Sequence, residues 1–282
     1  MNKAFLTVDL EEWYHLDYLD TETCRGTGVR VVPQIFDFLD MLDDEGVKAT
    51  FFCVGDIAEE NADILRELLR RGHSLGCHGW DHTLLTDKSV EQFLEETRMA
   101  RDAIEAAAGT KITGYRASCF TMERDKLEAL RAMGFQYDSS KICFSQHPLY
   151  RNLDMTGYYN VEDLIYVREG FVEYEIPTLD IMKWSIPISG GGYLRLFPFW
   201  LLRLLLGRYA KDHGNFTIYV HPFELTPMPL PLPKDLGFGT KFRCLVGRRG
   251  NLKKLRRVIR WLNRRGARFI TLEQDRKERG LT

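Results

Sequence analysis

The sequence has almost no net charge and no closely paired cysteines. It contains 39 Lys and Arg residues against 40 Asp and Glu residues, a net charge of −1, so no overall positive field would attract nucleic acid. Its six cysteines show no C-x-x-C spacing, and we expect them to be small buried hydrophobic residues rather than nucleophiles. We therefore predict that nucleic acid is not a partner.

The sequence also lacks an apolar run long enough to cross a membrane. In its most apolar stretch, residues 194–206, a proline and two arginines interrupt the run, which makes it too short and too charged to span a bilayer. We expect a core helix there; the alternative is a peripheral helix face that touches lipid, supported by the basic residues between 248 and 257. Because the first strand begins at once and leaves no room for a signal peptide, we expect a cytoplasmic protein, peripheral to the inner membrane in the alternative.

Neither internal repeats nor low-complexity linkers divide the 282 residues. With 44% hydrophobic residues, this length is sufficient for one large domain. Short apolar segments alternate with longer amphipathic ones, which favours a parallel sheet wrapped by helices. We predict strands near residues 4–9, 48–54, 74–77, 112–116, 172–177, 216–220 and 268–271, and helices at 31–45, 57–71, 89–108, 123–133, 197–212 and 251–265.

Two histidines, His78 and His82, follow the predicted strand at 74–77. Residues four apart lie on one face of a helical turn, and neutral imidazole is the commonest protein ligand for metal ions such as zinc. The spacing by itself also fits two surface or hydrogen-bonded histidines. The hypothesis of a metal site therefore depends on acidic residues elsewhere in the chain.

Three acidic residues, Asp9, Glu11 and Glu12, stand at the end of the first predicted strand. In a parallel α/β fold, ligands bind at the edge where the carboxyl ends of the strands meet. Alternation along the strand places Asp9 and Glu11 on one face and Glu12 on the other. We predict that His78, His82 and Glu11 are metal ligands and that Asp9 is a general base. Glu12 is the alternative ligand, and an acidic strand end that caps a turn is the alternative without a metal.

Five sequence motifs occur together in the order typical of one enzyme family. In these motifs the chain resembles the polysaccharide deacetylases, carbohydrate esterase family four, which share the NodB homology domain. The resemblance covers about residues 3–275, and the ordered set is far more specific than any single motif. The motifs are TVDLE at 7–11, ATFFCVG at 49–55, GHSLGCHGWDH at 72–82, GYR at 114–116 and YVHPFE at 219–224.

The resemblance implies an α/β fold, a distorted (β/α) barrel of about seven parallel strands. It implies removal of N-acetyl groups from sugars with the help of a divalent ion, usually zinc, with Co²⁺ or Ni²⁺ as alternatives. Carried over to this sequence, Asp9 matches the catalytic base, and His78 and His82 match the metal ligands. His221 matches the histidine of the opposite wall, which would protonate the departing sugar amine.

The resemblance further implies how the chain is organised and what it acts on. We expect one catalytic domain over residues 1–282, in which the part from about 140 onward is an extension specific to one branch. The GGGY segment at 190–193 and the HPFE segment at 221–224 resemble the bacterial branch linked to exopolysaccharide and surface-glycan gene clusters. The expected partner is therefore an N-acetylated glycan or a lipid-linked glycan.

One further catalytic candidate, Arg116, belongs to the GYR motif. We expect its guanidinium to lie near Asp9, where the positive charge keeps that carboxylate ionised. The chain also departs from the usual family pattern at three places: Leu10 separates Asp9 from Glu11, Gly79 replaces a residue with a hydroxyl group, and Ala117-Ser118 replace a proline after Arg116.

Five residues are weaker candidates for contact with the substrate. Aromatic side chains in a cleft pack on the apolar faces of sugar rings, and a backbone N–H in the stretch 118–120 would bind the developing oxyanion. The alternatives are ordinary core aromatics and, for the aspartate, a turn cap or a residue that braces the site. The candidates are Trp13, Trp80, Ser118, Asp138 and Tyr193.

Two other functions stay open at this point. A metal-dependent amidohydrolase of a non-sugar linear or cyclic C–N bond would use the same fold and chemistry. An inactive glycan-binding module would keep the groove but lose a ligand or the base, and the presence of Asp9, His78, His82 and His221 argues against it. A zinc peptidase is disfavoured because Gly79 stands where H-E-x-x-H requires a glutamate.

Overall fold

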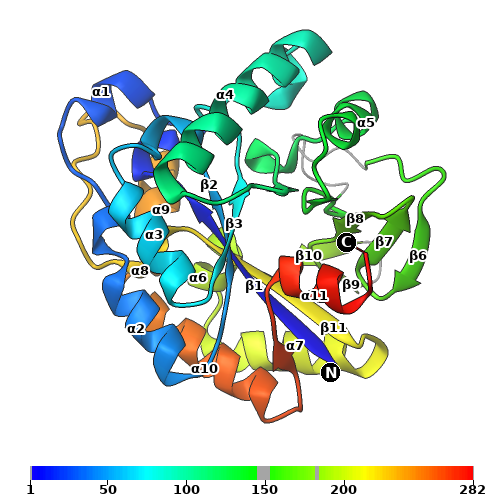
Figure 1. Cartoon of the computed structure of the whole chain (residues 1–282). Helices are drawn as coiled ribbons and strands as arrows, with labels where there is room; N and C mark the ends of the chain where they lie inside the picture. Colours follow the sequence, from blue (N-terminus) through cyan, green and yellow to red (C-terminus); the bar gives the residue numbers. More distant parts are fainter. Residues whose placement is uncertain (1, 145–152, 182–183, 282) are drawn as a thin grey trace.

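The computed structural model describes residues 2–144, 153–181 and 184–281. A sheet of parallel strands runs through the middle of the molecule in the order β11-β1-β2-β3-β4-β5-β8, with β12 paired to β1 and with β7 and β6 added antiparallel beyond β8 (Figure 1). The strands are β1 (Lys3–Leu10), β2 (Thr50–Cys53), β3 (Ser74–Cys77), β4 (Gly114–Tyr115), β5 (Tyr137–Asp138), β6 (Tyr159–Glu162), β7 (Ile165–Arg168), β8 (Phe171–Tyr174), β9 (Thr178–Ile181), β10 (Trp184–Pro187), β11 (Asn215–Val220) and β12 (Arg268–Phe269).

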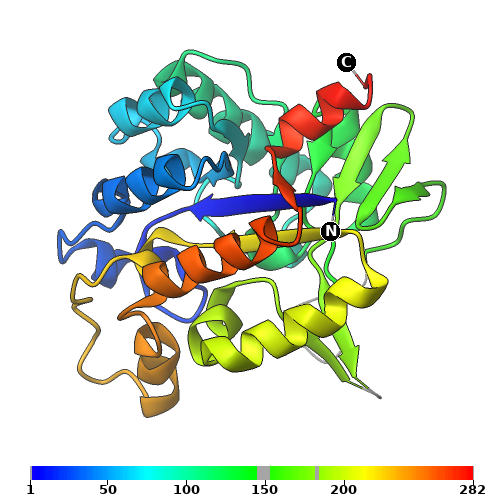
Figure 2. The same ribbon diagram turned by 90° about the horizontal axis from the view of Figure 1, so that it is seen from below.

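The helices lie around the outside of this sheet (Figures 1 and 2). The longest, α4, begins at a capping box formed by Ser89 and Gln92 and ends at Gly109, whose φ of 72° favours glycine. Their bounds are α1 (Thr21–Arg25), α2 (Phe36–Asp44), α3 (Ala62–Arg70), α4 (Val90–Ala108), α5 (Arg124–Ala132), α6 (Gly191–Leu196), α7 (Phe199–Asp212), α8 (Pro222–Leu225), α9 (Phe238–Leu245), α10 (Asn251–Asn263) and α11 (Leu272–Glu278).

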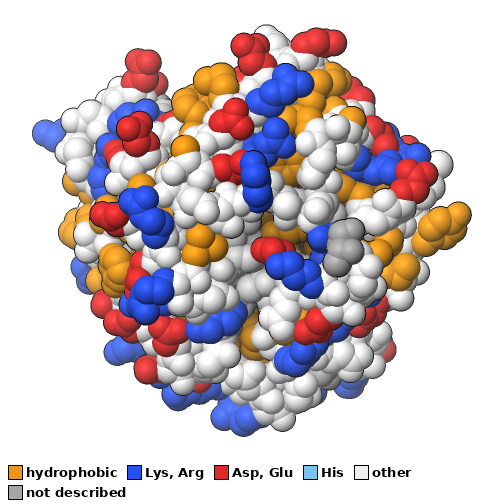
Figure 3. Space-filling view, in the orientation of Figure 1, with side chains coloured by type: hydrophobic (Ala, Val, Ile, Leu, Met, Phe, Trp, Pro, Cys, Tyr) orange, Lys and Arg blue, Asp and Glu red, His pale blue; other side chains and the backbone are white. Residues whose placement is uncertain are grey.

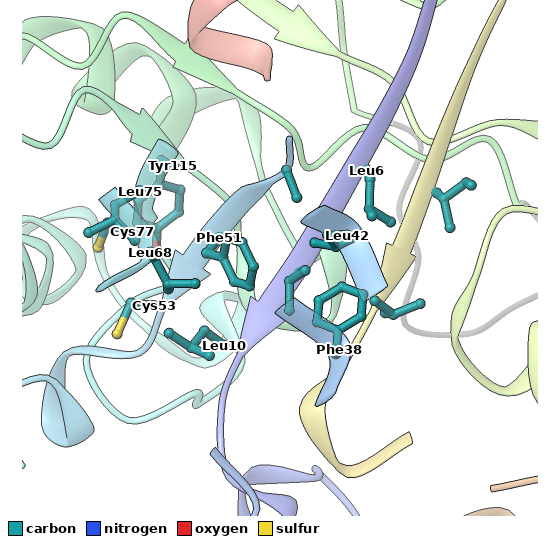
Figure 4. Close-up of a cluster of buried hydrophobic side chains, with 14 of the residues drawn as sticks. Leu6, Leu10, Phe38, Leu42, Phe51, Cys53, Leu68, Leu75, Cys77 and Tyr115 are labelled. Atoms are coloured by element: carbon teal, nitrogen blue, oxygen red, sulfur yellow. The ribbon is translucent and has the colours of Figure 1, made fainter. Parts of the chain in front are cut away.

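The two faces of the strands are buried in different ways. Figure 4 shows Leu6 and Leu10 of β1 and Phe51 of β2 packed with Phe38 of α2 and Leu68 of α3. The alternate residues of the same strands turn to the inside of the sheet, where Phe5 and Phe52 form a second cluster with Tyr137, Tyr174 and others. Because β1 has a period of two, Thr7 and Asp9 share this inner side with Phe5.

The described residues form a distorted α/β barrel. All seven predicted strands occur as parallel strands, and β5 is an eighth that the sequence analysis does not include. No strand ladder joins β8 to β11 among the described residues, so the barrel is open there. The antiparallel ribbon β6–β7 and the hairpin β9–β10 were also not predicted. Within the described ranges, no helix is long and apolar enough to cross a lipid bilayer.

His73, directly before β3, makes stability depend on pH. Its ring is only 4% exposed, and its Nδ1 accepts a 3.1 Å hydrogen bond from the backbone N–H of Ala49. Burial, with a smaller contribution from Lys48, lowers its pKa to about 4. As the pH falls, His73 therefore takes up a proton in the unfolded chain at a higher pH than in the folded chain. The stability that neutral His73 contributes is complete above about pH 6.5 and declines toward pH 4.

We expect this linkage to appear when His73→Asn, which keeps an acceptor for Ala49, is compared with the unchanged chain. Between pH 7 and pH 5, the free energy of unfolding of the unchanged chain should fall by about 2 kcal/mol more than that of the variant. Urea titrations at both pH values measure the difference. Parallel losses in the two proteins would contradict the assignment.

Candidate active site

Four polar side chains predicted from different parts of the sequence meet at the carboxyl ends of neighbouring strands. Asp9 lies in β1, His78 directly follows β3, Arg116 follows β4 and His221 follows β11. Because β11, β1, β2, β3 and β4 are parallel neighbours, their carboxyl ends share one edge. A cavity of about 170 Å³ opens at this edge. Its lining includes Asp9, Glu11, Tyr18, His78, His82, Cys119, Phe120, Gly192, Arg195, Tyr219, His221 and Glu224.

Glu11, His78 and His82 form a cluster whose potential ligand atoms all lie within 4.8 Å of one another. All three side chains are buried. His82 Nε2 lies 3.0 Å from Glu11 Oε2, and His78 Nδ1 lies 2.8 Å from the carbonyl oxygen of Arg116. With Nδ1–H donating to that carbonyl, His78 Nε2 is free to act as a ligand.

The donor set of this cluster fits a divalent transition metal. Both carboxylate oxygens of Glu11 are buried and, apart from their proximity to His82, have no hydrogen-bond partner among the described residues. Burial raises the pKa of Glu11, but His82, His221 and His78 outweigh it and lower this pKa to about 2. A buried carboxylate beside two imidazoles, with open space next to them, matches a three-ligand site with a free position.

The loop between the two histidines has an unusual backbone. Gly79 has a φ of 78° and His82 a φ of 65°, both in the left-handed region that disfavours residues with a Cβ atom. The glycine at position 79, a departure from the family pattern, is therefore explained by backbone geometry. Orientation of His78 comes from the Arg116 carbonyl instead of from a hydroxyl group at position 79.

Asp9 forms a buried ion pair with Arg116. Arg116 Nη1 lies 2.7 Å from Asp9 Oδ1 and also donates to Thr7 Oγ1, while Nε and Nη2 donate to the carbonyl and hydroxyl oxygens of Ser139. Burial raises the pKa of Asp9, but Arg116, His78 and His221 together hold it below its usual value. Asp9 is therefore ionised at neutral pH, and its second oxygen, Oδ2, faces the cavity residue His221 at 3.6 Å.

His221 faces Asp9 and Glu11 with one ring nitrogen and contacts Glu224 with the other. Its Nε2 lies 3.6 Å from Asp9 Oδ2 and 3.9 Å from Glu11 Oε1, and its Nδ1 lies 3.1 Å from Glu224 Oε2. Burial lowers the pKa of His221, but Glu224, Glu11 and Asp9 raise it to about 9. The imidazole therefore carries a proton at neutral pH.

Glu224 is a site residue for which the sequence analysis predicts no role. It stands at the third position of α8, where its carboxylate accepts from the backbone N–H of His221 in a capping box. Its other oxygen accepts a 2.7 Å bond from Arg195, which is also buried. The signal was present in the sequence, because proline at the first helical position and glutamate at the third are typical of such a cap.

Glu12 lies outside the cluster, on the opposite face of the chain. Its carboxylate accepts hydrogen bonds of 2.6 and 3.1 Å from the backbone N–H groups of Val31 and Val32. This side chain orders the turn before α2 and does not contact His78 or His82. The alternation that separates Glu11 from Glu12 is thus observed in the structure.

The five weaker substrate candidates lie at different positions relative to the cavity. Trp13 is fully buried and donates to the carbonyl of Val29, and Trp80 packs against the main core, so neither lines the cavity. Ser118 is buried beside the cavity, and the two residues that follow it, Cys119 and Phe120, line the cavity. Asp138 is buried and bonds to Ser140, which in turn accepts from the backbone N–H of Ala117, so it braces the loop after Arg116. Tyr193 is half-buried and lines a second cavity that adjoins the first.

Residues 30–137 match the family model for polysaccharide deacetylases. Over these residues, fewer than half of the chain, the sequence is similar to the polysaccharide deacetylases. This segment contains His78, His82 and Arg116. Residues 145–274, which include His221 and Glu224, match a domain of unknown function, DUF3473, and Asp9 and Glu11 precede both matches.

Curated relatives resemble only part of the chain. A peptidoglycan-N-acetylglucosamine deacetylase, PgdA of Listeria monocytogenes, is 35% identical over 66 residues, which cover 23% of this chain and 14% of PgdA. A chitooligosaccharide deacetylase of Sinorhizobium fredii is 34% identical over 107 residues, covering 33% of this chain and 50% of the relative. In both cases the match spans half or less of the relative's length.

Solved structures resemble nearly the whole chain in fold. A family 4 acetyl xylan esterase from Clostridium thermocellum, determined in complex with a cobalt ion, superimposes with a TM-score of 0.54 at 16% sequence identity. The match covers 100% of this chain and 93% of the esterase chain. The barrel thus extends across both segments that match family models.

Proposed function

We propose that the protein is a metal-dependent hydrolase that removes N-acetyl groups from an N-acetylated sugar. The observation that carries this proposal is the meeting of an ionised Asp9, a protonated His221 and the Glu11–His78–His82 cluster in one cavity. Hydrolysis of an amide requires a base for water, an acid for the amine and stabilisation of the oxyanion. The cavity offers a group for each requirement.

Glu11, His78 and His82 would hold the ion, for which we propose Zn²⁺, with Co²⁺ or Ni²⁺ as alternatives. A bound divalent ion polarises the acetamide carbonyl and acidifies a water molecule. Asp9 would take a proton from the attacking water at Oδ2, because its Oδ1 is engaged by Arg116. Arg116 thus acts as a positioning residue that also keeps the base ionised.

The remaining steps concern the oxyanion and the leaving amine. A backbone N–H at the start of the turn Ser118–Phe120 would donate to the oxyanion from the wall formed by Cys119. His221 transfers its Nε2 proton to the amine nitrogen, and Glu224 stabilises the imidazolium and fixes the ring through Nδ1. Without that proton the amine is a poor leaving group.

We expect His221→Ala to slow hydrolysis of an N-acetylated sugar by two or more orders of magnitude, roughly the scale of general acid catalysis. The variant should hydrolyse a phenolic acetate ester, whose leaving group does not need the proton, with a much smaller loss of rate. Rates on the amide and the ester substrates, measured side by side, test the acid role. Equal losses on both substrates would contradict it.

We also propose that residues 1–282 act as one catalytic domain, in which the part from about 140 onward supplies a wall of the active site. The support is that β11, which leads to His221, pairs with β1, which carries Asp9, along six residue pairs. Neither the part before about residue 140 nor the part after it contains both the proposed acid, His221, and the proposed base, Asp9. For the substrate we propose a bacterial surface glycan or its lipid-linked precursor, in agreement with the exopolysaccharide-type motifs.

The experiment that tests this function is acetate release by the purified chain with added zinc. Chitooligosaccharides and other N-acetylated glycans form one arm and allantoin, a cyclic amide, forms the other. We expect acetate from a glycan and no turnover of allantoin. Hydrolysis of allantoin alone would instead support a non-sugar amidohydrolase, and glycan binding without any turnover would support an inactive module.

A further inference from the structure

Helices α6 and α7 turn several large apolar side chains to the outside of the molecule. Trp200 and Leu204 of α7 are 69% and 64% exposed, and Leu196, the last residue of α6, is also exposed. Spacing by four residues places Trp200 and Leu204 along one stripe of α7, and the extended residues Phe197 and Pro198 separate this stripe from Leu196. In a soluble protein, such a stripe is normally covered by another element or has polar residues in place of the apolar ones.

Helix α9 adds a second group of exposed apolar side chains next to the first. Phe238 is 85% exposed, and its ring stacks with that of Phe242, with a distance of 6.4 Å between ring centroids. Phe242 and Leu196 line the same cavity, so α9 and α6 are neighbours. Figure 2 shows α6, α7 and α9 along one edge of the molecule. We call this area the apolar surface; it consists of Leu196, Trp200, Leu204, Phe238, Phe242 and Leu245.

Positive charges accompany the apolar surface. A groove of about 1060 Å³ beside Trp200 and Leu204 is also lined by Arg203, Arg208, Lys211, Arg257 and Arg265. Residues 191–250 contain nine Lys and Arg residues but only three Asp and Glu residues, although the whole chain has a net charge of −1. Two of the nine basic residues, Arg195 and Arg248, and one of the three acidic residues, Glu224, are buried, so the excess of positive charge remains at the surface. On the face drawn in Figure 3, by contrast, acidic and basic side chains are interspersed.

The apolar surface borders the opening of the candidate active site. The cavity that Leu196 and Phe242 line, about 380 Å³, is also lined by Tyr18, Gly192 and Arg195. The same three residues line the cavity that contains Asp9 and His221. A ligand held at the apolar surface would therefore lie beside the proposed catalytic groups.

We propose that the apolar surface docks the protein onto an anionic lipid bilayer. Aromatic and aliphatic side chains enter the interfacial region, and the surrounding cations contact the lipid headgroups. A second copy of the chain fits less well, because a twofold contact would bring the same cations of both copies together. The same orientation would turn the catalytic cavity toward a sugar anchored in the membrane, a consequence that rests on the proposed function.

Vesicle flotation with the full chain tests this proposal. The probes are phosphatidylcholine vesicles with and without phosphatidylglycerol. We expect binding only when phosphatidylglycerol is present, and we expect added salt to reduce it because the headgroup attraction is screened. The double variant Trp200→Glu, Leu204→Glu should bind at least about tenfold more weakly, since it removes apolar contacts and adds negative charge.

Tyr159→Glu, Val161→Glu is the matched control, because these side chains are similarly exposed on the β6–β7 ribbon. It should bind vesicles as the unchanged chain does. Acetate release from a soluble N-acetylated saccharide should be unchanged in both double variants, so failure of docking and failure of the proposed hydrolase function are distinguishable. The proposal is overturned by absence of vesicle binding, by equal losses in the two variants, or by a solution dimer that Trp200→Glu, Leu204→Glu dissociates while vesicles are not bound.

Discussion

The Asp9→Asn variant is expected to release acetate between about a hundredfold and ten-thousandfold more slowly than the unchanged chain. Asparagine preserves the shape of the side chain but cannot accept a proton from water. Asp9 Oδ2 is the oxygen turned toward His221 and the cavity. Glu11 cannot replace it without leaving the proposed metal cluster, and Glu224 is engaged by Arg195 and His221. Steady-state kinetics should show the loss in kcat, with metal content unchanged.

A structural explanation must be separated from this chemical one. Asp9→Asn also leaves Arg116 buried without its counter-ion, and loss of one partner of a buried pair costs about 3–5 kcal/mol of stability. Ser139→Ala is the control, because it removes another hydrogen bond of Arg116 while keeping Asp9. If Ser139→Ala slows hydrolysis as much as Asp9→Asn does, then Asp9 acts through the structure and not as the base.

The sequence was sufficient to predict the parts of the fold that have a strong local signal. The stripe of Ile64, Leu65 and Leu68 in α3 and the capping residues of α4 identify helices by themselves. The buried parallel strands are continuous apolar runs between them, so their existence and order were predicted. These elements form the part of the barrel that carries His78 and Arg116.

The missed elements are those whose stability comes from contacts distant in sequence. β5 has two residues and is defined only by its pairing with β4 and β8. In the ribbon β6–β7, residues 159–161 are exposed and carry no alternation that marks a buried face. Helix α9 is only eight residues long and buries a single residue, Cys244, so few core contacts define it.

The same distinction applies to the site. The histidine pair and the acidic strand end were predictable because each is a short motif at a strand end. Hydrogen bonds such as those between Arg116 and Ser139, or between Arg195 and Glu224, join residues 23 and 29 positions apart and have no sequence spacing of their own. The aromatic candidate Trp13 was wrong as a cavity residue because it is fully buried and donates to the carbonyl of Val29.

The second large effect concerns the metal. We expect the unchanged chain to contain about one divalent ion and the double variant His78→Ala, His82→Ala to contain almost none, with acetate release abolished. The variant lacks two of the three proposed ligands, and Glu11 alone would not hold a transition metal in competition with water. Metal analysis after dialysis measures the content, and His213→Ala, a histidine paired with Asp163 outside the cavity, is the control. Full occupancy in the double variant would disprove the ligand assignment.

The third ligand can be tested by comparing Glu11→Gln with Glu12→Gln. Glu11 has two buried oxygens next to His82 and no other hydrogen-bond partner in the described part of the chain, so its replacement should weaken metal binding more than overall stability. Glu12 accepts from Val31 and Val32, so its replacement should lower the free energy of unfolding and leave metal content unchanged. The opposite pattern would transfer the ligand role to Glu12 and would require the chain after β1 to rotate by one residue, which reverses the faces of both carboxylates.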